Sequence, residues 1–229
     1  MALELFGTPM SPFVRKVRIC LEEKGLDYTL HPVSPFDPPA GWRELSPLGR
    51  VPVLRDTRIG TDGAAGTLAD SSSICVYLER LAAQPRLYPA DPFEHARAIW
   101  LEEFADTELA VRIGFGIWRT VVMGPLNGQE PDCAAAEATV RDKLPRSFAY
   151  LEAQLGSRSG FSGDMFSIAD IAVVAQLIGF RHGGFVIDAV AYPALAAWLE
   201  RTLARSSVAR LLEEDFAALG AHSRMIRSE

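Results

Sequence analysis

The sequence has few cysteines and histidines, and those present do not form a metal site. Its 229 residues include three cysteines, Cys20, Cys75 and Cys133, and four histidines. There is no Cys-x-x-Cys pair, and no group of cysteines and histidines has the spacing of zinc ligands. We therefore expect no metal cofactor. Cys20 and Cys75 fall on apolar faces of expected helices, where we expect plain core residues.

A surplus of basic residues is also missing. The chain has 23 lysines and arginines against 29 aspartates and glutamates, a formal net charge of −6. Because nucleic acids and anionic membranes both attract basic surfaces, we expect neither as a partner. Basic residues do cluster at Arg15, Lys16 and Arg18, and such a cluster on one helix is typical of a solvated face.

Long apolar runs and the sequence features of a leader peptide are missing as well. No apolar run approaches the roughly 18 residues of a membrane span, and the N-terminus has neither a basic n-region nor an apolar h-region. We therefore expect a cytoplasmic protein. With 48% hydrophobic and 23% charged residues, the composition is typical of a globular protein. The length allows one large domain or two modest ones.

The first 25 residues predict a strand, a loop and a helix. Leu3–Phe6 is short and mostly apolar, and the following Gly7-Thr8-Pro9 has turn chemistry. Ser11 suits a helix N-cap and Pro12 the first helical position. Such a loop presents one hydroxyl at the positive end of a helix, where a thiolate or another small anion is stabilised. The other interpretation of Ser11 is that it only caps its helix.

The remaining patterns divide the chain into two parts. Strand patterns at 27–33, 51–54 and 66–69, with a long hairpin loop over 55–67, lead to a helix that begins at Asp70-Ser71. We expect a domain with a mixed four-stranded sheet over 1–84 and a proline-rich linker over 85–92. Beyond it the patterns are helical over 93–104, 135–155, 168–179 and 195–203. A capping box at Ser167 and Asp170 indicates a folding role, and no clear period follows Phe216.

The order and spacing of several short motifs resemble the cytosolic glutathione S-transferases. These motifs are Ser11-Pro12-Phe13, Arg50-Val51-Pro52-Val53-Leu54, Asp70-Ser71, Ser167-Ile168-Ala169-Asp170 and Tyr192-Pro193. The run from Ser11 to Arg18 is most similar to serine-type members, such as the plant tau class and its bacterial relatives. The resemblance implies an α/β thioredoxin-like N-terminal domain (1–84) and an all-α C-terminal domain (93–229). It also implies a homodimer, with glutathione as co-substrate bound between the domains.

The resemblance implies a role for each matched position. Ser11 would be the catalytic residue, donating a hydrogen bond to the glutathione sulfur. A cis peptide bond before Pro52 would leave the Val51 backbone free to pair with the cysteinyl backbone of glutathione. Asp70 would take the γ-glutamyl ammonium and Ser71 its carboxylate. The full glutathione-binding set is Ser11, Phe13, Arg50, Val51, Pro52, Asp70 and Ser71.

Each of these roles has a plainer alternative. Arg50, expected at the glycyl end, could be a solvated loop charge, and Asp70-Ser71 could simply cap a helix. The family usually has Glu-Ser where this chain has Asp70-Ser71, so the carboxylate is one methylene shorter. The loop over 55–67 is also longer than the family's tight hairpin.

The expected reaction is conjugation of the glutathione thiolate to a small hydrophobic electrophile, a detoxification chemistry. We expect Met10, Phe115, Trp118, Arg119 and Phe180 to line the electrophile site. A thiol–disulfide enzyme is disfavoured because it would need a cysteine at position 11, and an isomerase of the zeta type would need a serine-rich loop there. A non-catalytic glutathione- or ligand-binding protein of the same fold stays open, as does a glutathione-dependent isomerase or peroxidase.

Overall fold

The computed structural model describes residues 3–225. The chain forms two compact units, and the division falls between Leu87 and Tyr88. This boundary lies inside the proline-rich segment over 85–92. The two units are described separately below as unit 1 and unit 2.

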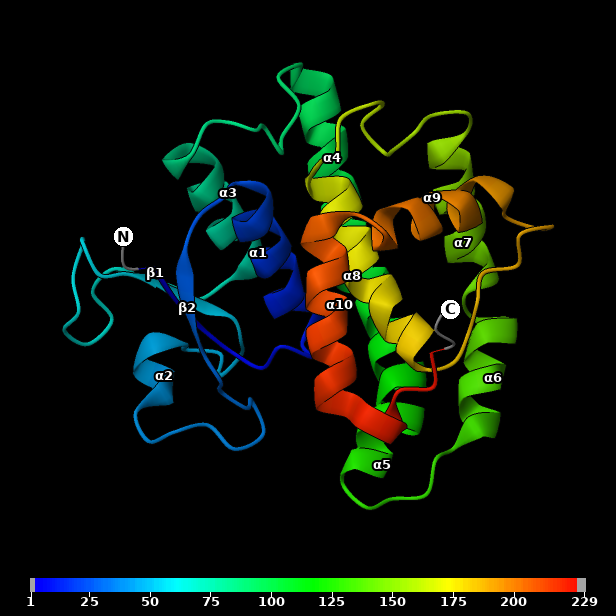
Figure 1. The fold of residues 1–229 in the computed structure, drawn as a ribbon, viewed down its shortest axis with the longest axis horizontal. Coiled ribbons are helices and arrows are strands. Elements are labelled where there is room, and N and C mark those ends of the chain that lie inside the picture. Colours follow the sequence, from blue (N-terminus) through cyan, green and yellow to red (C-terminus); the bar gives the residue numbers. More distant parts are fainter. Residues whose placement is uncertain (1–2, 226–229) are drawn as a thin grey trace. The chain divides into compact units, whose positions relative to one another are not determined.

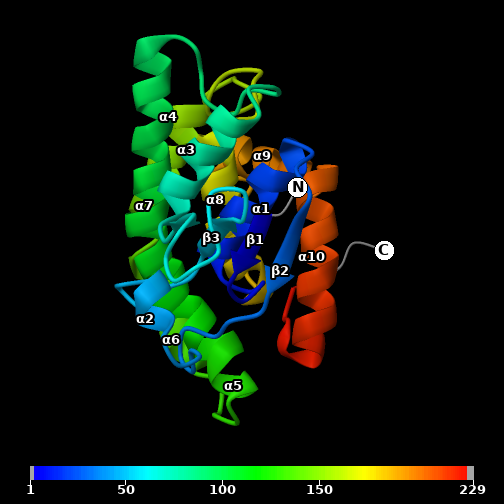
Figure 2. The same ribbon diagram turned by 90° about the vertical axis from the view of Figure 1, so that its left-hand side faces the viewer.

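Unit 1 is built on a mixed four-stranded sheet (Figures 1 and 2). The strands lie in the order β2-β1-β3-β4, with β1 parallel to β2, β1 antiparallel to β3, and β3 antiparallel to β4. This arrangement confirms the predicted thioredoxin-like α/β domain. The elements in chain order are β1 (Leu3–Phe6), α1 (Pro12–Glu23), β2 (Tyr28–His31), α2 (Trp42–Leu45), β3 (Val53–Asp56), β4 (Thr67–Leu68) and α3 (Ser71–Leu81).

The side chains of β1 alternate between the two faces of the sheet. Leu5 is fully buried and pairs across the sheet with Leu54 of β3. Phe6 points to the opposite face, where its ring lies 6.3 Å from that of Trp42 in α2 and stacks at 4.8 Å on His31. Helices α1 and α3 pack against each other.

The prediction that the basic residues of α1 form a solvated face is wrong. Arg15, Lys16 and Arg18 are all buried, with exposed fractions of 2%, 0% and 4%. The Nε of Arg18 donates to the Tyr28 hydroxyl over 2.8 Å, and the Nζ of Lys16 donates to the Ser72 hydroxyl over 3.0 Å. These partners come from β2 and α3, so the burial depends on contacts that are distant in the sequence.

Strand β3 begins two residues later than the sequence predicts. Pro52 has no N–H to give to a strand ladder, and the peptide bond between Val51 and Pro52 is cis. The strand therefore starts at Val53 and runs to Asp56. Its last two residues lie in the segment that was expected to be loop. The returning strand β4 is correspondingly short.

Asp56 fastens the long loop that follows β3. Its carboxylate accepts hydrogen bonds from Arg58 and from the Tyr77 hydroxyl of α3. Its backbone N–H donates to Gly66 at the far end of the loop over 2.9 Å. The hydrogen bond from Arg58 is the main reason why the pKa of the Asp56 carboxyl lies well below its usual range, and the Tyr77 hydrogen bond lowers it further. The loop is therefore a bonded structure rather than an open connection.

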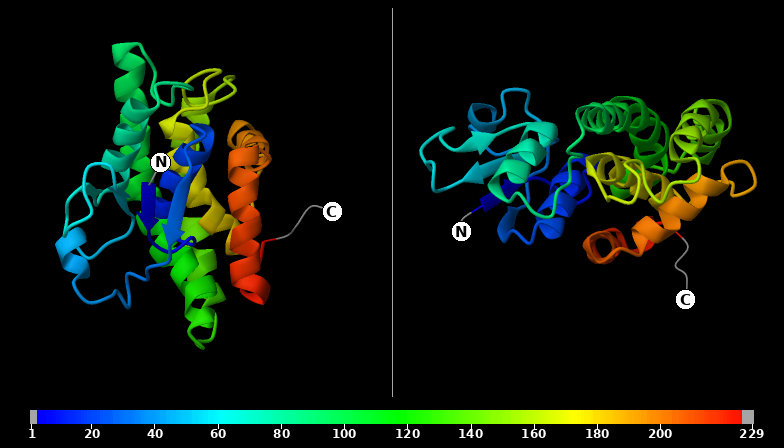
Figure 3. Two further views of the ribbon diagram at one scale, coloured as in Figure 1. Left: turned by 60° about the vertical axis from the view of Figure 1, so that its left-hand side comes forward. Right: turned by 90° about the horizontal axis from the view of Figure 1, so that it is seen from above.

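Unit 2 is all-helical, as predicted; the right-hand view in Figure 3 looks along several of its helices, which stand side by side. Helix α8 is its centre, because nearly all of its residues are buried and it packs on η1, α4 and α9. The elements are α4 (Pro92–Phe104), η1 (Ala105–Met123), α5 (Gly124–Leu126), α6 (Cys133–Asp142), α7 (Pro145–Leu155), α8 (Ile168–His182), α9 (Pro193–Leu203), α10 (Ser206–Leu219) and η2 (Gly220–His222).

The predicted capping box at the start of α8 is confirmed. Asp170 is buried and accepts from the Ser167 N–H over 3.0 Å, from the Phe161 N–H over 3.1 Å and from the Trp198 indole over 2.9 Å. Burial raises the pKa of this carboxyl. The box therefore fixes both the start of α8 and its packing on α9.

Helix η1 continues α4 as a wide π-type helix, which the sequence did not single out. Its buried residues recur at every fourth position, Ala105, Leu109, Ile113, Ile117 and Val121. The joined helix Pro92–Leu126 is the one helix, among the described residues, that is long and apolar enough by length and composition to cross a membrane. A core helix can meet the same criteria, and a third of its most apolar window is buried.

Two boundaries in unit 2 differ from the sequence prediction. The segment 135–155 is two helices, because α6 ends at Asp142 and α7 starts afresh with Pro145 at its first position. Helix α10 extends to Leu219 although no clear period follows Phe216. The final residues, 226–229, lie outside the described part of the chain.

Candidate functional site

Ser11 is the N-cap of α1, and its backbone is extended there. Its Oγ accepts a long hydrogen bond of 3.5 Å from the Val14 N–H, while its carbonyl accepts from the Arg15 N–H over 2.9 Å. Capping uses an oxygen lone pair, and a hydroxyl can donate its hydrogen at the same time. The half-buried Ser11 hydroxyl can therefore cap its helix and donate to a bound anion together.

The electrostatic surroundings of Ser11 favour such an anion. The N-terminus of a helix carries roughly half a positive charge. The first turn of α1 has no acidic residue to cancel it, and the buried cations Arg15 and Lys16 follow directly. This end of α1 is thus a positive position beside one available hydroxyl.

Val51 stands beside the first turn of α1 because residue 7 is a glycine. A Cβ on Gly7 would lie 2.5 Å from Cγ2 of Val14, which is shorter than real Cβ contacts, and 3.2 Å from Cβ of Val51, which is a tight contact. The peptide bond after Val51 is cis, as the family resemblance implies. Within residues 3–225 the N–H and C=O of Val51 have no backbone partner, so both can pair with an extended ligand.

Ser46 holds the segment that leads to Val51. Its hydroxyl donates to the Arg50 carbonyl over 2.8 Å and accepts from the Arg50 N–H over 3.0 Å. Ser46 is buried, whereas the side chain of Arg50 is exposed. The backbone of Arg50 is therefore fixed, and its guanidinium group faces solvent at the edge of the site.

The N-terminus of α3 supplies the other side of the site. Asp70 is its exposed N-cap, with one carboxylate oxygen accepting from the Ser73 N–H over 2.8 Å. Ser71 is the first residue of α3 and is only 6% exposed. The hydrogen bond from Lys16 of α1 to Ser72 joins this helix end to α1. Two helix N-termini of unit 1 are thereby tied together.

The structure thus groups part of the predicted set and separates the rest. Val51 lies beside α1, which begins after Ser11, because both approach Gly7. The hydrogen bond from Lys16 to Ser72 joins α1 to α3, the helix that begins at Ser71. Pro52 follows Val51, and Phe13 is half-buried in the first turn of α1. The exposed residues Arg50 and Asp70 lie at the edge. Met10 is half-buried in the loop before α1.

The predicted electrophile residues of unit 2 do not form one surface. Phe115 and Arg119 are exposed on η1, and Trp118 between them is half-buried. Phe180 is fully buried in the core of unit 2, where its ring lies 5.5 Å from that of Phe148. It has no exposed surface to offer a second substrate, so its place in the predicted set is corrected.

Sequence reasoning missed the residues that hold the site together. A glycine directly after a strand could have indicated the close approach at Gly7. A polar residue four positions after Trp42 does not distinguish Ser46 from any other loop serine. No local signal shows that Lys16 is buried, because its partner Ser72 is 56 residues away.

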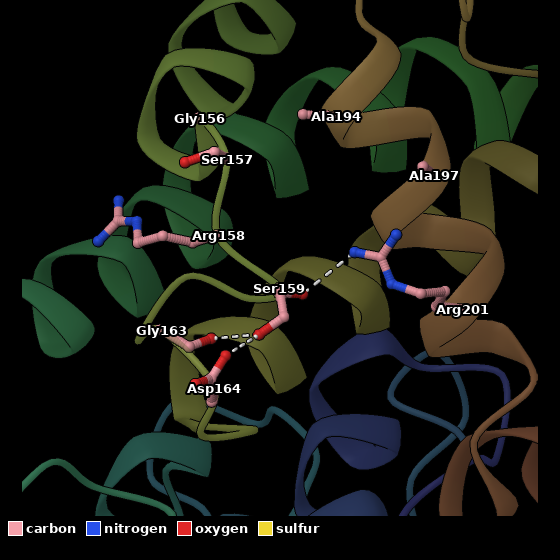
Figure 4. Close-up of a pocket in the computed structure, with 9 residues that line it drawn as sticks. All are labelled: Gly156, Ser157, Arg158, Ser159, Gly163, Asp164, Ala194, Ala197 and Arg201. Atoms are coloured by element: carbon pink, nitrogen blue, oxygen red, sulfur yellow. Dashed lines mark hydrogen bonds between the residues drawn. The ribbon is translucent and has the colours of Figure 1, made fainter.

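Unit 2 has an open cavity of about 720 Å³ that involves none of the predicted residues (Figure 4). It lies between the end of α7, the loop after it and α9. The Ser159 hydroxyl lies 2.9 Å from both the Gly163 carbonyl and the Asp164 carboxylate, and Arg201 donates to the Ser159 carbonyl over 3.2 Å. Because these polar groups bond to one another, they hold the shape of the loop that lines the cavity.

Comparisons with known proteins identify the family of both units. The family model described as "Glutathione S-transferase, N-terminal domain" matches residues 5–86, and "Glutathione S-transferase, C-terminal domain" matches residues 100–201. The two ranges together span most of the chain.

Individual proteins match over almost their whole length. The chain is 29% identical over 215 residues to an uncharacterized GST-like protein, YibF, of Escherichia coli K12, covering 91% of this chain and 97% of YibF. It is 28% identical over 214 residues to glutathione S-transferase F13 of Arabidopsis thaliana, covering 90% and 92%. A solved structure of a glutathione S-transferase from Rhodospirillum rubrum F11 matches with a TM-score of 0.80 at 25% identity, covering 91% of each chain.

Proposed function

Because the chain belongs to the glutathione S-transferase family, we propose that it binds glutathione in unit 1 and conjugates its thiolate to a small hydrophobic electrophile. The observation that carries the proposal is the Ser11 hydroxyl at the N-terminus of α1, which caps the helix as an acceptor and can still donate. The protein would act in the cytoplasm as a homodimer, as the family resemblance implies.

The first chemical step is loss of the thiol proton to solvent water. Ser11 donates a hydrogen bond to the glutathione sulfur, and the positive end of α1 adds to the stabilisation of the thiolate. A shift of one pKa unit in the bound thiol corresponds to about 1.4 kcal/mol, which is within reach of one hydrogen bond and a helix end. The thiolate then attacks the electrophilic carbon, and the new S–C bond forms as a leaving group such as halide departs or, in an enal or isothiocyanate, as a π bond breaks and its atom takes up a proton from water.

The rest of the tripeptide has partners of matching chemistry in unit 1. The unpaired backbone groups of Val51 suit the cysteinyl backbone, like one added strand rung. The N-terminus of α3 at Ser71 suits the γ-glutamyl carboxylate, and the second oxygen of Asp70 suits the neighbouring ammonium. The exposed Arg50 side chain suits the glycyl carboxylate. No metal is required for any of these contacts.

On unit 2 the electrophile site is proposed at Phe115, Trp118 and Arg119 of η1, and Met10 of unit 1 stays a separate candidate. The aromatic side chains provide apolar contact area, and Arg119 favours an acceptor with some negative charge. Phe180 is left out because it is buried.

Two measurements on the purified protein test the proposal. The first is glutathione binding by calorimetry, and the second is the ultraviolet difference spectrum of the bound thiolate as a function of pH. We expect binding and a thiol pKa below that of free glutathione. Binding without a lowered thiol pKa would favour a non-catalytic glutathione-binding protein of the same fold, and absence of binding would overturn both.

A substrate screen then separates the reaction types. Aryl halides, enals and isothiocyanates report conjugation, whereas peroxides report a glutathione peroxidase and maleyl compounds an isomerase. Conjugation to any of the first group, lost in Ser11→Ala, is the expected result.

A further inference from the structure

We propose that Cys20 and Cys75 are a redox-active pair that closes to a disulfide between α1 and α3 when a hydroperoxide such as H₂O₂ oxidises it. The sequence alone indicates two ordinary core residues. In the structure neither cysteine is in a disulfide, and the Sγ of Cys20 lies 3.4 Å from the Sγ of Cys75. The sulfur atoms are thus in direct contact although the residues are 55 positions apart.

The two helices are held at this separation on both sides of the pair. One turn before Cys20, Lys16 of α1 bonds to Ser72 of α3 over 3.0 Å. One turn after it, the Nζ of Lys24 lies 2.7 Å from the Glu79 carboxylate. The cysteines therefore form the middle one of three successive contacts between α1 and α3. A disulfide needs a sulfur–sulfur bond of about 2.0 Å, so side-chain rotation has only a short gap to close.

The chemistry balances with one peroxide. One cysteine gives up its thiol proton, its thiolate attacks a peroxide oxygen, and the O–O bond breaks to leave a sulfenic acid and hydroxide. The hydroxide takes up the released proton and becomes water. The thiol of the other cysteine attacks the sulfenic sulfur, the S–S bond forms, and a second water leaves. The two thiols lose two electrons and two protons, and the peroxide is reduced to two waters. Because the second sulfur is already in contact, ring closure is favoured over further oxidation to a sulfinic acid.

Burial determines which reagents can reach the pair. Cys20 is 0% and Cys75 is 1% exposed, so bulky thiol reagents are excluded from the folded protein, whereas a peroxide as small as H₂O₂ can enter during small fluctuations. Cys133 is half-buried in unit 2, where Arg224 donates to its sulfur over 3.0 Å. The structure describes all three cysteines, and Cys133 has no cysteine neighbour among them. Cys133 therefore serves as an internal reference for an isolated thiol.

The disulfide would link the helix that begins at Ser11 to the helix that begins at Asp70-Ser71. Oxidation would therefore restrain the two helix ends that the proposed glutathione site uses. This consequence depends on the proposed function, but formation of the disulfide does not.

The experiment uses the full chain with and without Cys133→Ala. Reduced protein is treated with H₂O₂, denatured, and alkylated with a maleimide, and its intact mass and linked peptides are measured. We expect two of the three thiols to be lost in the wild-type protein, one peptide pair joining Cys20 to Cys75, and full recovery with dithiothreitol. The Cys133→Ala protein should lose both of its thiols in the same way.

Cys20→Ala and Cys75→Ala provide the matched controls, each with its fold checked by circular dichroism. In either variant the remaining partner should give no intramolecular disulfide. The proposal is overturned if both thiols of the pair stay alkylatable after Cys133 is fully oxidised, or if the pair oxidises only to separate sulfinic acids. Because no glutathione is present, either outcome leaves the proposed transferase function to be judged by its own test.

Discussion

The ammonium of Lys24, at the end of α1, and the carboxylate of Glu79 in α3 form an ion pair of 2.7 Å, with the lysine side chain fully buried. The same ammonium donates to the carbonyls of Ala82 and Pro85 over 2.8 Å each. One cation thus satisfies a carboxylate and two carbonyl groups, and it fastens the end of α3 and the following segment to α1.

Replacing Lys24 with methionine is predicted to destabilise unit 1 strongly. Among the described residues the Glu79 carboxylate would keep only the Leu87 N–H, and two carbonyls would lose the Lys24 ammonium. Breaking a buried pair in this way costs about 3–5 kcal/mol. Adding Glu79→Gln to Lys24→Met should restore part of the loss. Urea unfolding measures the free energies. As a control, Lys143→Met at an exposed position should change stability by less than about 0.5 kcal/mol.

Ser11→Ala is predicted to lower the conjugation rate about 10²-fold, the usual effect of removing one donor to a developing anion. Glutathione affinity should change little, because the backbone and carboxylate contacts stay. The thiolate difference spectrum and steady-state kinetics measure the two effects. Ser11→Thr keeps both cap and donor and should retain most of the rate. An alanine variant as fast as the wild type would leave Ser11 with only its capping role.

Gly7→Ala is predicted to disturb the site without touching a proposed ligand contact. Its Cβ would meet Val14 and Val51, and overpacking of this kind costs about 1–3 kcal/mol. Glutathione should also bind more weakly because Val51 is displaced. Gly114→Ala is the matched control, since its Cβ would have no neighbour within 4 Å. Equal glutathione affinity of the Gly7→Ala and wild-type proteins would contradict this role.

Asp56 is predicted to make unit 1 sensitive to acid. Its pKa is depressed in the folded protein, chiefly by Arg58 and also by Tyr77, so the folded state prefers the ionised form. The stabilisation is present above the ordinary aspartate pKa of about 4 and is lost as the pH falls below it. In Asp56→Asn the unfolding free energy should be lower at neutral pH and should fall less steeply on acidification. Asp62→Asn, at an exposed loop position, should keep the wild-type profile.

Local signals explain what could be predicted from the sequence. Helix caps depend on neighbouring residues, so Ser11, Asp70 and the box of Ser167 with Asp170 all lie where the sequence places them. The sheet of unit 1 and the helices of unit 2 follow from periodicity in the same way. The candidate site could be predicted to the extent that it consists of such helix ends.

Contacts between distant residues explain what could not be predicted. A charge run on a helix normally faces water, but Lys16 and Arg18 meet polar partners on α3 and β2. The contact between Cys20 and Cys75 depends on how α1 and α3 are packed. Phe180 has the same type of side chain as the exposed Phe115, and only tertiary packing separates them.

The spacing of four residues along η1 makes that helix tolerant of some changes in length and intolerant of others. Its buried positions, from Ala105 to Val121, alternate with exposed ones such as Val111 and Phe115 two residues away. Inserting four residues would return each later side chain to the side it occupies now. Inserting two would exchange the sides, so that Ile113 and Ile117 met water while Phe115 and Arg119 turned against α8.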